Sequence, residues 1–175
     1  MFAPLPAPPH YAPAIHPLTP VEKAFLTSYA LGDSRRHRKW GYERRDMEHY
    51  AQSVKTKMRA RTKRWPELVY RAVVHQEIPP PLPRRTEVSL DDPMLWTVSG
   101  LAAGWHSADL AAELGMDAPA WSVWEKRLLN RVQASTIPHT VYLCARLIPW
   151  PWTLAGEWDA LKRIPNQSGL LVRSH

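Results

Sequence analysis

At 175 residues and 45% hydrophobic content, the chain has room for one domain of ordinary size or for two small ones with buried cores. No apolar run reaches the roughly 18 residues of a membrane span, and the N-terminal residues lack the pattern of a signal peptide, so we expect a cytoplasmic protein without membrane contact. The net charge of +7 favours an anionic partner, and residues 1–86 carry all of the excess, with 16 Lys and Arg against 7 Asp and Glu.

The chain begins with a Pro-rich arm and then a helix. Residues 1–17 are rich in Pro and Ala and have no helical or strand period, which predicts disorder. A capping box follows, with Thr19 as N-cap, Pro20 at the first helical position and Glu22 three residues after the cap. Gly32 is expected to end this helix. Its apolar face comprises Phe25, Leu26, Tyr29 and Ala30.

A basic stretch, residues 34–40, leads to a long amphipathic helix within residues 43–62. Its apolar residues recur at helical spacing and are Met47, Tyr50, Val54 and Met58. A fourth helix is expected at about residues 66–75, and the prolines of residues 78–85 predict a polyproline-like spacer. These elements define a first unit at residues 18–76 and a Pro-rich linker at residues 77–88.

The same layout returns in a second unit, residues 89–148. We expect helices at residues 90–104, after an N-cap at Ser107, after an N-cap at Asp117, and within residues 137–148. The third of these carries a stripe with the spacing seen in the first unit, formed by Trp121, Trp124, Leu128 and Val132. Gly104 ends the first helix of this unit as Gly32 ends the first helix of the other, which indicates an internal duplication. Residues 149–175 are expected to form a C-terminal tail with one short helix.

Two short helices joined by a turn that contains glycine define the helix-turn-helix, whose second helix enters the DNA major groove. Gly41 and Gly115 lie where such turns need a residue that tolerates left-handed φ. We therefore predict an all-α chain with two four-helix helix-turn-helix units in tandem. Four-helix units without a DNA function show a similar pattern.

A known family follows the pattern of the second unit. The matching residues are Leu90, Gly104, Leu110, Ala111, Leu114, Gly115, Trp121, Leu128, Val132 and Val141. With these residues, the segment 90–145 resembles the LuxR/GerE-type four-helix DNA-binding module. Residues 18–73 resemble the same module through LTPVEKAFLTSYALG and the stripe Met47, Val54 and Met58, although the segment between Gly32 and Gly41 is two residues short. Another register aligns Ser53–Thr56 with a similar tetrapeptide of the family.

The resemblance implies a transcription regulator that binds double-stranded DNA with the third helix of each unit. In that family the fourth helix pairs two modules across a palindrome. Two copies in one chain therefore predict either a pseudo-dimer within the chain or a homodimer. The candidate interface residues are Val69, Val73, Val141 and Leu143.

Polar residues near the start of the first unit's third helix are the candidates for contact with bases, because Arg pairs with guanine, Gln with adenine and Glu with cytosine. They are Arg44, Arg45, Glu48, His49 and Gln52. Candidates for contact with phosphates are Arg35, Arg36, Arg38, Lys39, Lys55, Lys57, Arg59, Arg61, Lys63 and Arg64. In the second unit the corresponding candidates are Ala118, Pro119, Ser122, Val123, Lys126 and Arg127. The alternative is that these charges only solvate an exposed helix.

Two other functions stay open. LTPVEKAFLTSY followed by a basic segment that ends in Gly-Tyr resembles the opening of small terminase subunits, which implies a phage or mobile-element DNA-binding accessory factor. The Trp-rich half is also compatible with a module that binds the transcription machinery. The sequence contains no phosphate-binding Gly-rich loop, no metal-ligand spacing and no recognisable catalytic constellation, and the single cysteine, Cys144, excludes an intrachain disulfide. We expect no catalysis, cofactor or metal.

Overall fold

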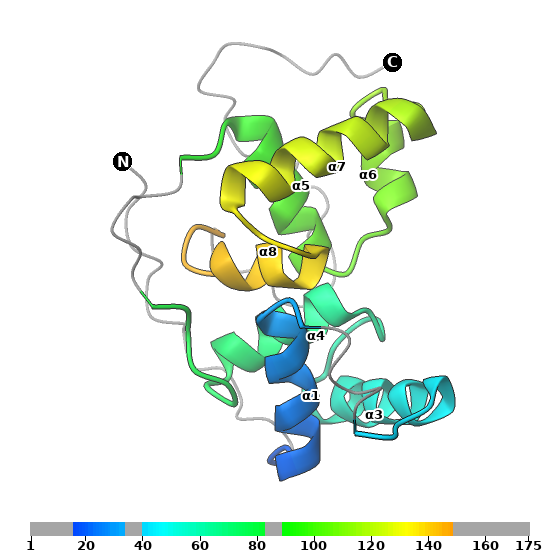
Figure 1. Ribbon diagram of the computed structural model, residues 1–175, viewed down its shortest axis with the longest axis vertical. Coiled ribbons are helices and arrows are strands. Elements are labelled where there is room, and N and C mark those ends of the chain that lie inside the picture. Colours follow the sequence, from blue (N-terminus) through cyan, green and yellow to red (C-terminus); the bar gives the residue numbers. More distant parts are fainter. Residues whose placement is uncertain (1–15, 34–39, 83–88, 149–175) are drawn as a thin grey trace.

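The computed structural model describes residues 16–33, 40–82 and 89–148, and within them it contains seven α-helices and no strand, which confirms the all-α prediction. The helices are α1 (Pro20–Ala30), α3 (Arg44–Lys57), α4 (Trp65–Val74), α5 (Asp92–Ala102), α6 (Ser107–Glu113), α7 (Ala118–Val132) and α8 (Ile137–Leu143) (Figure 1). Most of the predicted arm, the basic stretch 34–39, linker residues 83–88 and the predicted tail lie outside the described residues. None of the described helices is long and apolar enough to span a membrane.

Local capping patterns locate most helix starts. The Thr19 hydroxyl accepts a hydrogen bond from the Glu22 amide (3.3 Å), and the Glu22 carboxylate accepts one from the Thr19 amide (2.7 Å), which confirms the capping box. Asp117 is the N-cap of α7, as predicted. The predicted N-cap of α6 is wrong by one residue: His106 is the N-cap, because its carbonyl already accepts the first helical hydrogen bond, and Ser107 lies inside the helix. Helix α8 ends at Leu143, earlier than expected from the stop at Pro149.

The helix boundaries repeat along the chain. One constant offset in residue number carries both ends of α1 onto the ends of α5, and the same offset carries the start of α4 onto the start of α8. The offset between the N-caps of α3 and α7, Glu43 and Asp117, is slightly larger. The segment between α1 and the N-cap of α3 is therefore shorter than the segment between α5 and the N-cap of α7. The segment from that N-cap to α4 is longer, by the same amount, than the segment from the N-cap of α7 to α8.

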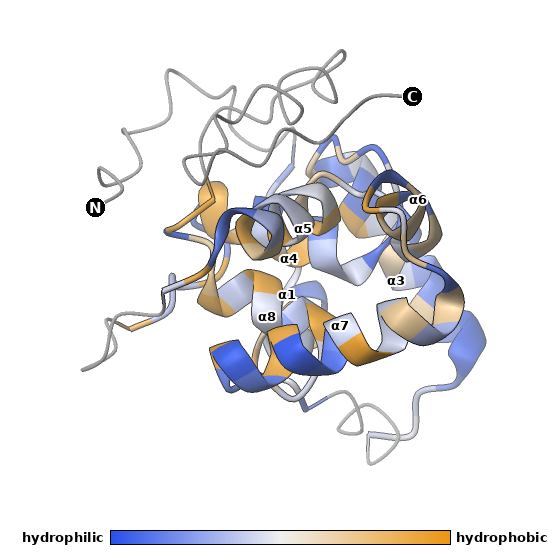
Figure 2. Ribbon diagram, turned by 90° about the horizontal axis from the view of Figure 1, so that it is seen from above, coloured by the Kyte–Doolittle hydropathy of each residue, from blue (hydrophilic) through white to orange (hydrophobic). Residues whose placement is uncertain are grey.

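The buried residues form two clusters that meet between α4 and α8. Residues from α1, α3 and α4 dominate one cluster, and residues from α5, α6, α7 and α8 dominate the other. Tyr142 of α8 belongs to the first cluster and Tyr70 of α4 to the second, while Val73 and Leu143 pack against both. Figure 1 shows the consequence: α4 and α8 lie in the middle of the long axis, with α3 toward one end and α6 and α7 toward the other. Viewed from above, α7 alternates between hydrophobic and hydrophilic residues (Figure 2), as an amphipathic surface helix should.

Hydrogen bonds also join the two halves. Arg64 Nη1 donates to the carbonyl of Gly104 (2.8 Å), and Ser135 Oγ donates to the carbonyl of Gly32 (3.2 Å). The Tyr142 hydroxyl donates to the carbonyl of Pro79 (3.1 Å). Within the predicted spacer, Ile78 is only 2% exposed and belongs to the first cluster. The linker therefore starts as part of the packed core.

Candidate nucleic-acid interface

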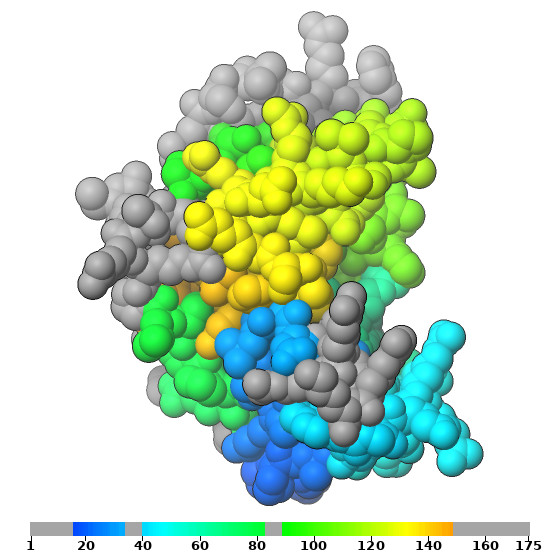
Figure 3. All heavy atoms as spheres, viewed as in Figure 1, coloured from blue at the N-terminus to red at the C-terminus, as the bar shows by residue number. Residues whose placement is uncertain are grey.

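One face of α3 is a continuous polar stripe. Its exposed or half-buried residues are Arg44, Arg45, Glu48, His49, Gln52, Lys55 and Arg59, the last directly after the helix. The stripe contains one ion pair, between Arg44 Nε and Glu48 Oε1 (3.4 Å), and both side chains remain mostly exposed. Such a pair contributes little to stability. In Figure 3 the side chains of α3 project from the lower right of the molecule, which leaves them open to a large partner.

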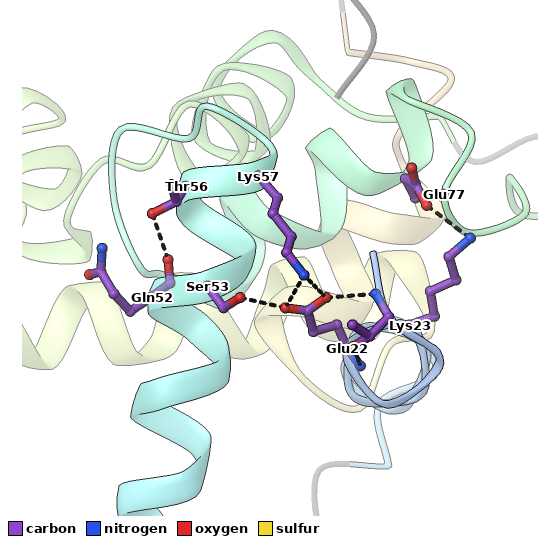
Figure 4. Close-up of polar contacts among 8 residues, drawn as sticks. Glu22, Lys23, Gln52, Ser53, Thr56, Lys57 and Glu77 are labelled. Carbon is purple, nitrogen blue, oxygen red and sulfur yellow. Dashed lines mark hydrogen bonds and ion pairs between the residues drawn. The ribbon is translucent and has the colours of Figure 1, made fainter. Parts of the chain in front are cut away.

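The opposite face of α3 is fixed to the core. Met47, Ala51 and Val54 are buried there. Next to them, Glu22 of α1 is 2% exposed and accepts hydrogen bonds from Ser53 Oγ (2.6 Å) and from Lys57 Nζ (2.7 and 3.0 Å) (Figure 4). The same carboxylate therefore caps α1 and holds α3 against it.

The contact with Glu22 changes the role expected of Lys57. The sequence predicts that Lys57 contacts a phosphate, but its ammonium group is bound to a buried carboxylate and its side chain is only 20% exposed. Arg64 is likewise bound to the Gly104 carbonyl. We assign both residues to the positioning of helices and leave them out of the candidate surface.

Burial alone raises the pKa of Glu22, but hydrogen bonds from Lys57, Ser53 and Thr19 outweigh it and leave the pKa below the ordinary value. A carboxylate with a lowered pKa stabilises the fold above its unfolded pKa, and this stabilisation is lost as the pH falls through the folded pKa.

We expect the melting temperature of the wild-type protein to fall as the pH drops below about 4.5, the range in which an unfolded Glu takes up a proton. The variant Glu22→Gln should be less stable at neutral pH, by about 1–3 kcal/mol, and should lack this part of the acid loss. Thermal unfolding of both proteins between pH 3 and pH 7 tests this, and two parallel curves would exclude Glu22 as the source.

Aromatic rings pack against Phe25 from the residues before α3 and from the middle of that helix. Tyr42 and Tyr50 lie 4.9 and 4.8 Å from the Phe25 ring, centroid to centroid, and Trp40 lies 6.1 Å from it. Phe25 is fully buried, whereas Trp40 is 44% exposed. The cluster fixes the chain that enters α3, and with it the direction of Arg44 and Arg45. Trp40 is not among the site residues predicted from the sequence, although its place directly before Gly41 was a signal.

The loop after α3 is held by a second buried carboxylate. Glu67 accepts hydrogen bonds from the amides of Arg61 (2.7 Å) and Thr62 (2.8 Å), from the Thr62 hydroxyl (2.8 Å) and from Arg71 Nε (2.9 Å). The Glu67 side chain is fully buried. These bonds turn the chain back toward α4 and leave the Arg61 side chain exposed beside α3.

The exposed face of α7 has a different chemistry. The exposed candidates there are Ala118, Pro119, Ser122, Val123, Lys126 and Arg127. Trp121 and Trp124 point to the inside, and their indole N–H groups donate to Glu125 and to Thr97 (3.2 Å each). Trp121 and Trp124 therefore pack in the interior of the protein. The exposed face of α7 begins with small and apolar residues.

The four candidate interface residues lie on α4 and α8, the two helices at which the clusters meet. Val69 and Val141 are fully buried, one in each cluster, and Val73 and Leu143 pack against both clusters.

The remaining basic candidates are only partly described. Arg35, Arg36, Arg38 and Lys39 lie outside the described residues, whereas Lys63 is exposed in the loop before α4. Within residues 16–33, 40–82 and 89–148, no group of three His, Cys, Asp or Glu side chains is placed to hold a metal ion.

No protein-family model matches this chain, and comparison with curated proteins and with solved structures finds no significant match. The resemblance to the LuxR/GerE-type module therefore remains a prediction from the sequence.

Proposed function

We propose that the protein binds double-stranded DNA as a sequence-specific regulator of transcription, with α3 in the major groove. The observation that carries the proposal is the division of α3 into two faces. One face is buried and fixed by Glu22, and the other presents arginine, histidine and glutamine side chains to solvent. A rigid helix with such an outer face is what base recognition in the major groove requires.

Each part of the outer face has a distinct role in this proposal. Arg44, Arg45 and Gln52 contact base edges, since Arg pairs with guanine and Gln with adenine. The cations nearer the C-terminal end and in the following loop contact phosphates and set the salt dependence of binding. These are Lys55, Arg59, Arg61 and Lys63.

The connection between α6 and α7 supports the same class of function. Helix α6 has seven residues, α7 has fifteen, and four residues, Leu114–Asp117, join them. Gly115 in this connection has a φ of +67°. A short turn with a left-handed glycine between two helices is typical of a helix-turn-helix. We propose that each half of the chain is one such unit.

Selection from a random duplex library, followed by measurement of Kd at two salt concentrations, tests the proposal. We expect an enriched motif, and Arg44→Ala/Arg45→Ala should weaken binding to it by about tenfold or more, because a bidentate Arg–guanine contact contributes roughly 1–3 kcal/mol. The charge-matched comparison is Lys126→Ala/Arg127→Ala, which removes the same charge from exposed positions of α7. Because these two residues are candidates for phosphate contact only, this variant should weaken binding by about threefold and leave the enriched motif unchanged.

The other outcomes are equally informative. Tight binding without an enriched motif, which falls steeply with salt, would replace the regulator by a DNA-binding accessory factor. Absence of binding at physiological salt would contradict the proposed function and favour a module that binds a protein partner.

A further inference from the structure

The contacts between the two halves are reciprocal. The carbonyl of Gly32 accepts a hydrogen bond from Ser135, in the loop before α8, and the carbonyl of Gly104 accepts one from Arg64, in the loop before α4. Since Gly32 and Gly104 are equivalent in the repeat, each half offers the same two surfaces to the other. Reciprocal use of the same surface characterises a two-fold dimer interface.

Two tyrosines show the same reciprocity between the halves. Tyr70 of α4 and Tyr142 of α8 are also equivalent in the repeat, and each packs in the cluster formed mainly by the other half. Helices α4 and α8 bury their inner faces against each other, so these faces are not open to a second chain. The two halves of one chain thus meet with the reciprocity of a two-fold dimer interface.

The two long helices are oriented alike with respect to this interface. Figure 1 shows the N-terminal ends of α3 and α7 on the same side of the molecule, toward opposite ends of its long axis. Dimeric DNA-binding proteins place two recognition helices in this way, on half-sites about one helical turn apart.

From this arrangement we infer that one chain covers two unequal half-sites on one face of a single duplex, α3 on one and α7 on the other. The inference rests on the proposed DNA binding. The half-sites are unequal because the two helices differ in chemistry. Arg44, Arg45 and Gln52 on α3 match hydrogen-bonding base edges, whereas Pro119 and Val123 at the start of α7 match thymine methyl groups.

Unequal halves set this chain apart from a symmetric dimer, which selects a palindrome. Ser122 offers the α7 half one hydroxyl for a base edge, and Lys126 and Arg127 offer charges for phosphates. The expected site therefore joins a guanine- or adenine-containing half, contacted by α3, to a thymine-rich half, contacted by α7.

The experiment uses the unmodified chain and the duplex obtained by selection. We expect one chain per duplex in sedimentation equilibrium and two segments protected from hydroxyl radicals, about one helical turn apart on one face. An insertion of about half a helical turn between the segments moves one of them to the opposite face, so binding should weaken by about tenfold, and replacement of the thymine-rich segment by G·C pairs should weaken it several-fold. In Lys126→Ala/Arg127→Ala the protection of the second segment should become weaker, while the protection of the first segment should stay as in the wild type.

The inference and the proposed function fail in different ways. A single protected segment, or unchanged affinity after the insertion, would overturn the inference and leave the proposed function intact. Two chains on each duplex would also overturn it, because the second unit would then come from a partner. No binding to any duplex would overturn both.

Discussion

Replacing Glu67 with alanine is expected to lower the free energy of unfolding by about 3–5 kcal/mol. The Glu67 carboxylate is fully buried and accepts four hydrogen bonds, including one from Arg71, which is itself only 6% exposed. The substitution leaves a buried guanidinium without its carboxylate and two loop amides without their acceptor. Each of these groups loses its compensation for desolvation.

Urea unfolding followed by circular dichroism measures this loss. The matched control is Glu48→Ala, which removes an exposed carboxylate paired with Arg44 and should change stability by less than about 0.5 kcal/mol. Glu67→Gln should fall between the two, because the amide keeps one acceptor but not the charge. Equal effects of Glu67→Ala and Glu48→Ala would contradict the role of Glu67 as a structural anchor.

Gly104→Ala is expected to be the second severe substitution, with a loss of about 2–4 kcal/mol. Gly104 has a φ of +86°, and an added Cβ would lie 3.0 Å from Glu67 Cδ, 3.1 Å from Thr62 Cγ2 and closer still to Glu67 Oε2. The Glu67 carboxylate cannot move away, because its four hydrogen bonds fix it. The added methyl group therefore forces the two halves apart at one of their reciprocal contacts.

Gly115→Ala is the control for Gly104→Ala. Gly115 has a similar φ of +67°, but an added Cβ would meet nothing within 4 Å. This variant should show only the backbone cost of the left-handed conformation, about 1–2 kcal/mol. The difference between the two variants, measured by urea unfolding, isolates the contact between the halves. If both lose the same amount, the space around Gly104 is not limiting.

Helices were predictable because their signals are local. The capping box at Thr19 and Glu22, the N-cap at Asp117 and the stripe from Met47 to Met58 lie within one or a few turns, and the structure confirms these caps and the burial of most of the stripe. The exposed face of α3 follows from the same periodicity. The N-cap of α6 is His106 and not the predicted Ser107. The backbone conformation decides which residue is the N-cap, and the sequence pattern locates a helix end only to within about a residue.

The anchors of the candidate surface were not predictable, because their partners are distant in the sequence. Glu22 appears as half of a capping box, and its hydrogen bonds to Ser53 and Lys57 span 31 and 35 residues. Glu67 has the pattern of an ordinary acidic residue in a first helical turn. Its burial depends on a loop that folds back over it. Lys57 was predicted to contact a phosphate for the same reason, because its partner Glu22 lies 35 residues away in the sequence.

The exchange of Tyr70 and Tyr142 between the two cores has a consequence for synthesis on the ribosome. The N-terminal half emerges first, but its core includes a side chain from α8, and Gly32 meets Ser135, 103 residues later in the chain. The first half therefore completes its packing only after nearly all of the described chain has left the exit tunnel. Until then its apolar surface on α4 stays open to water and to chaperones.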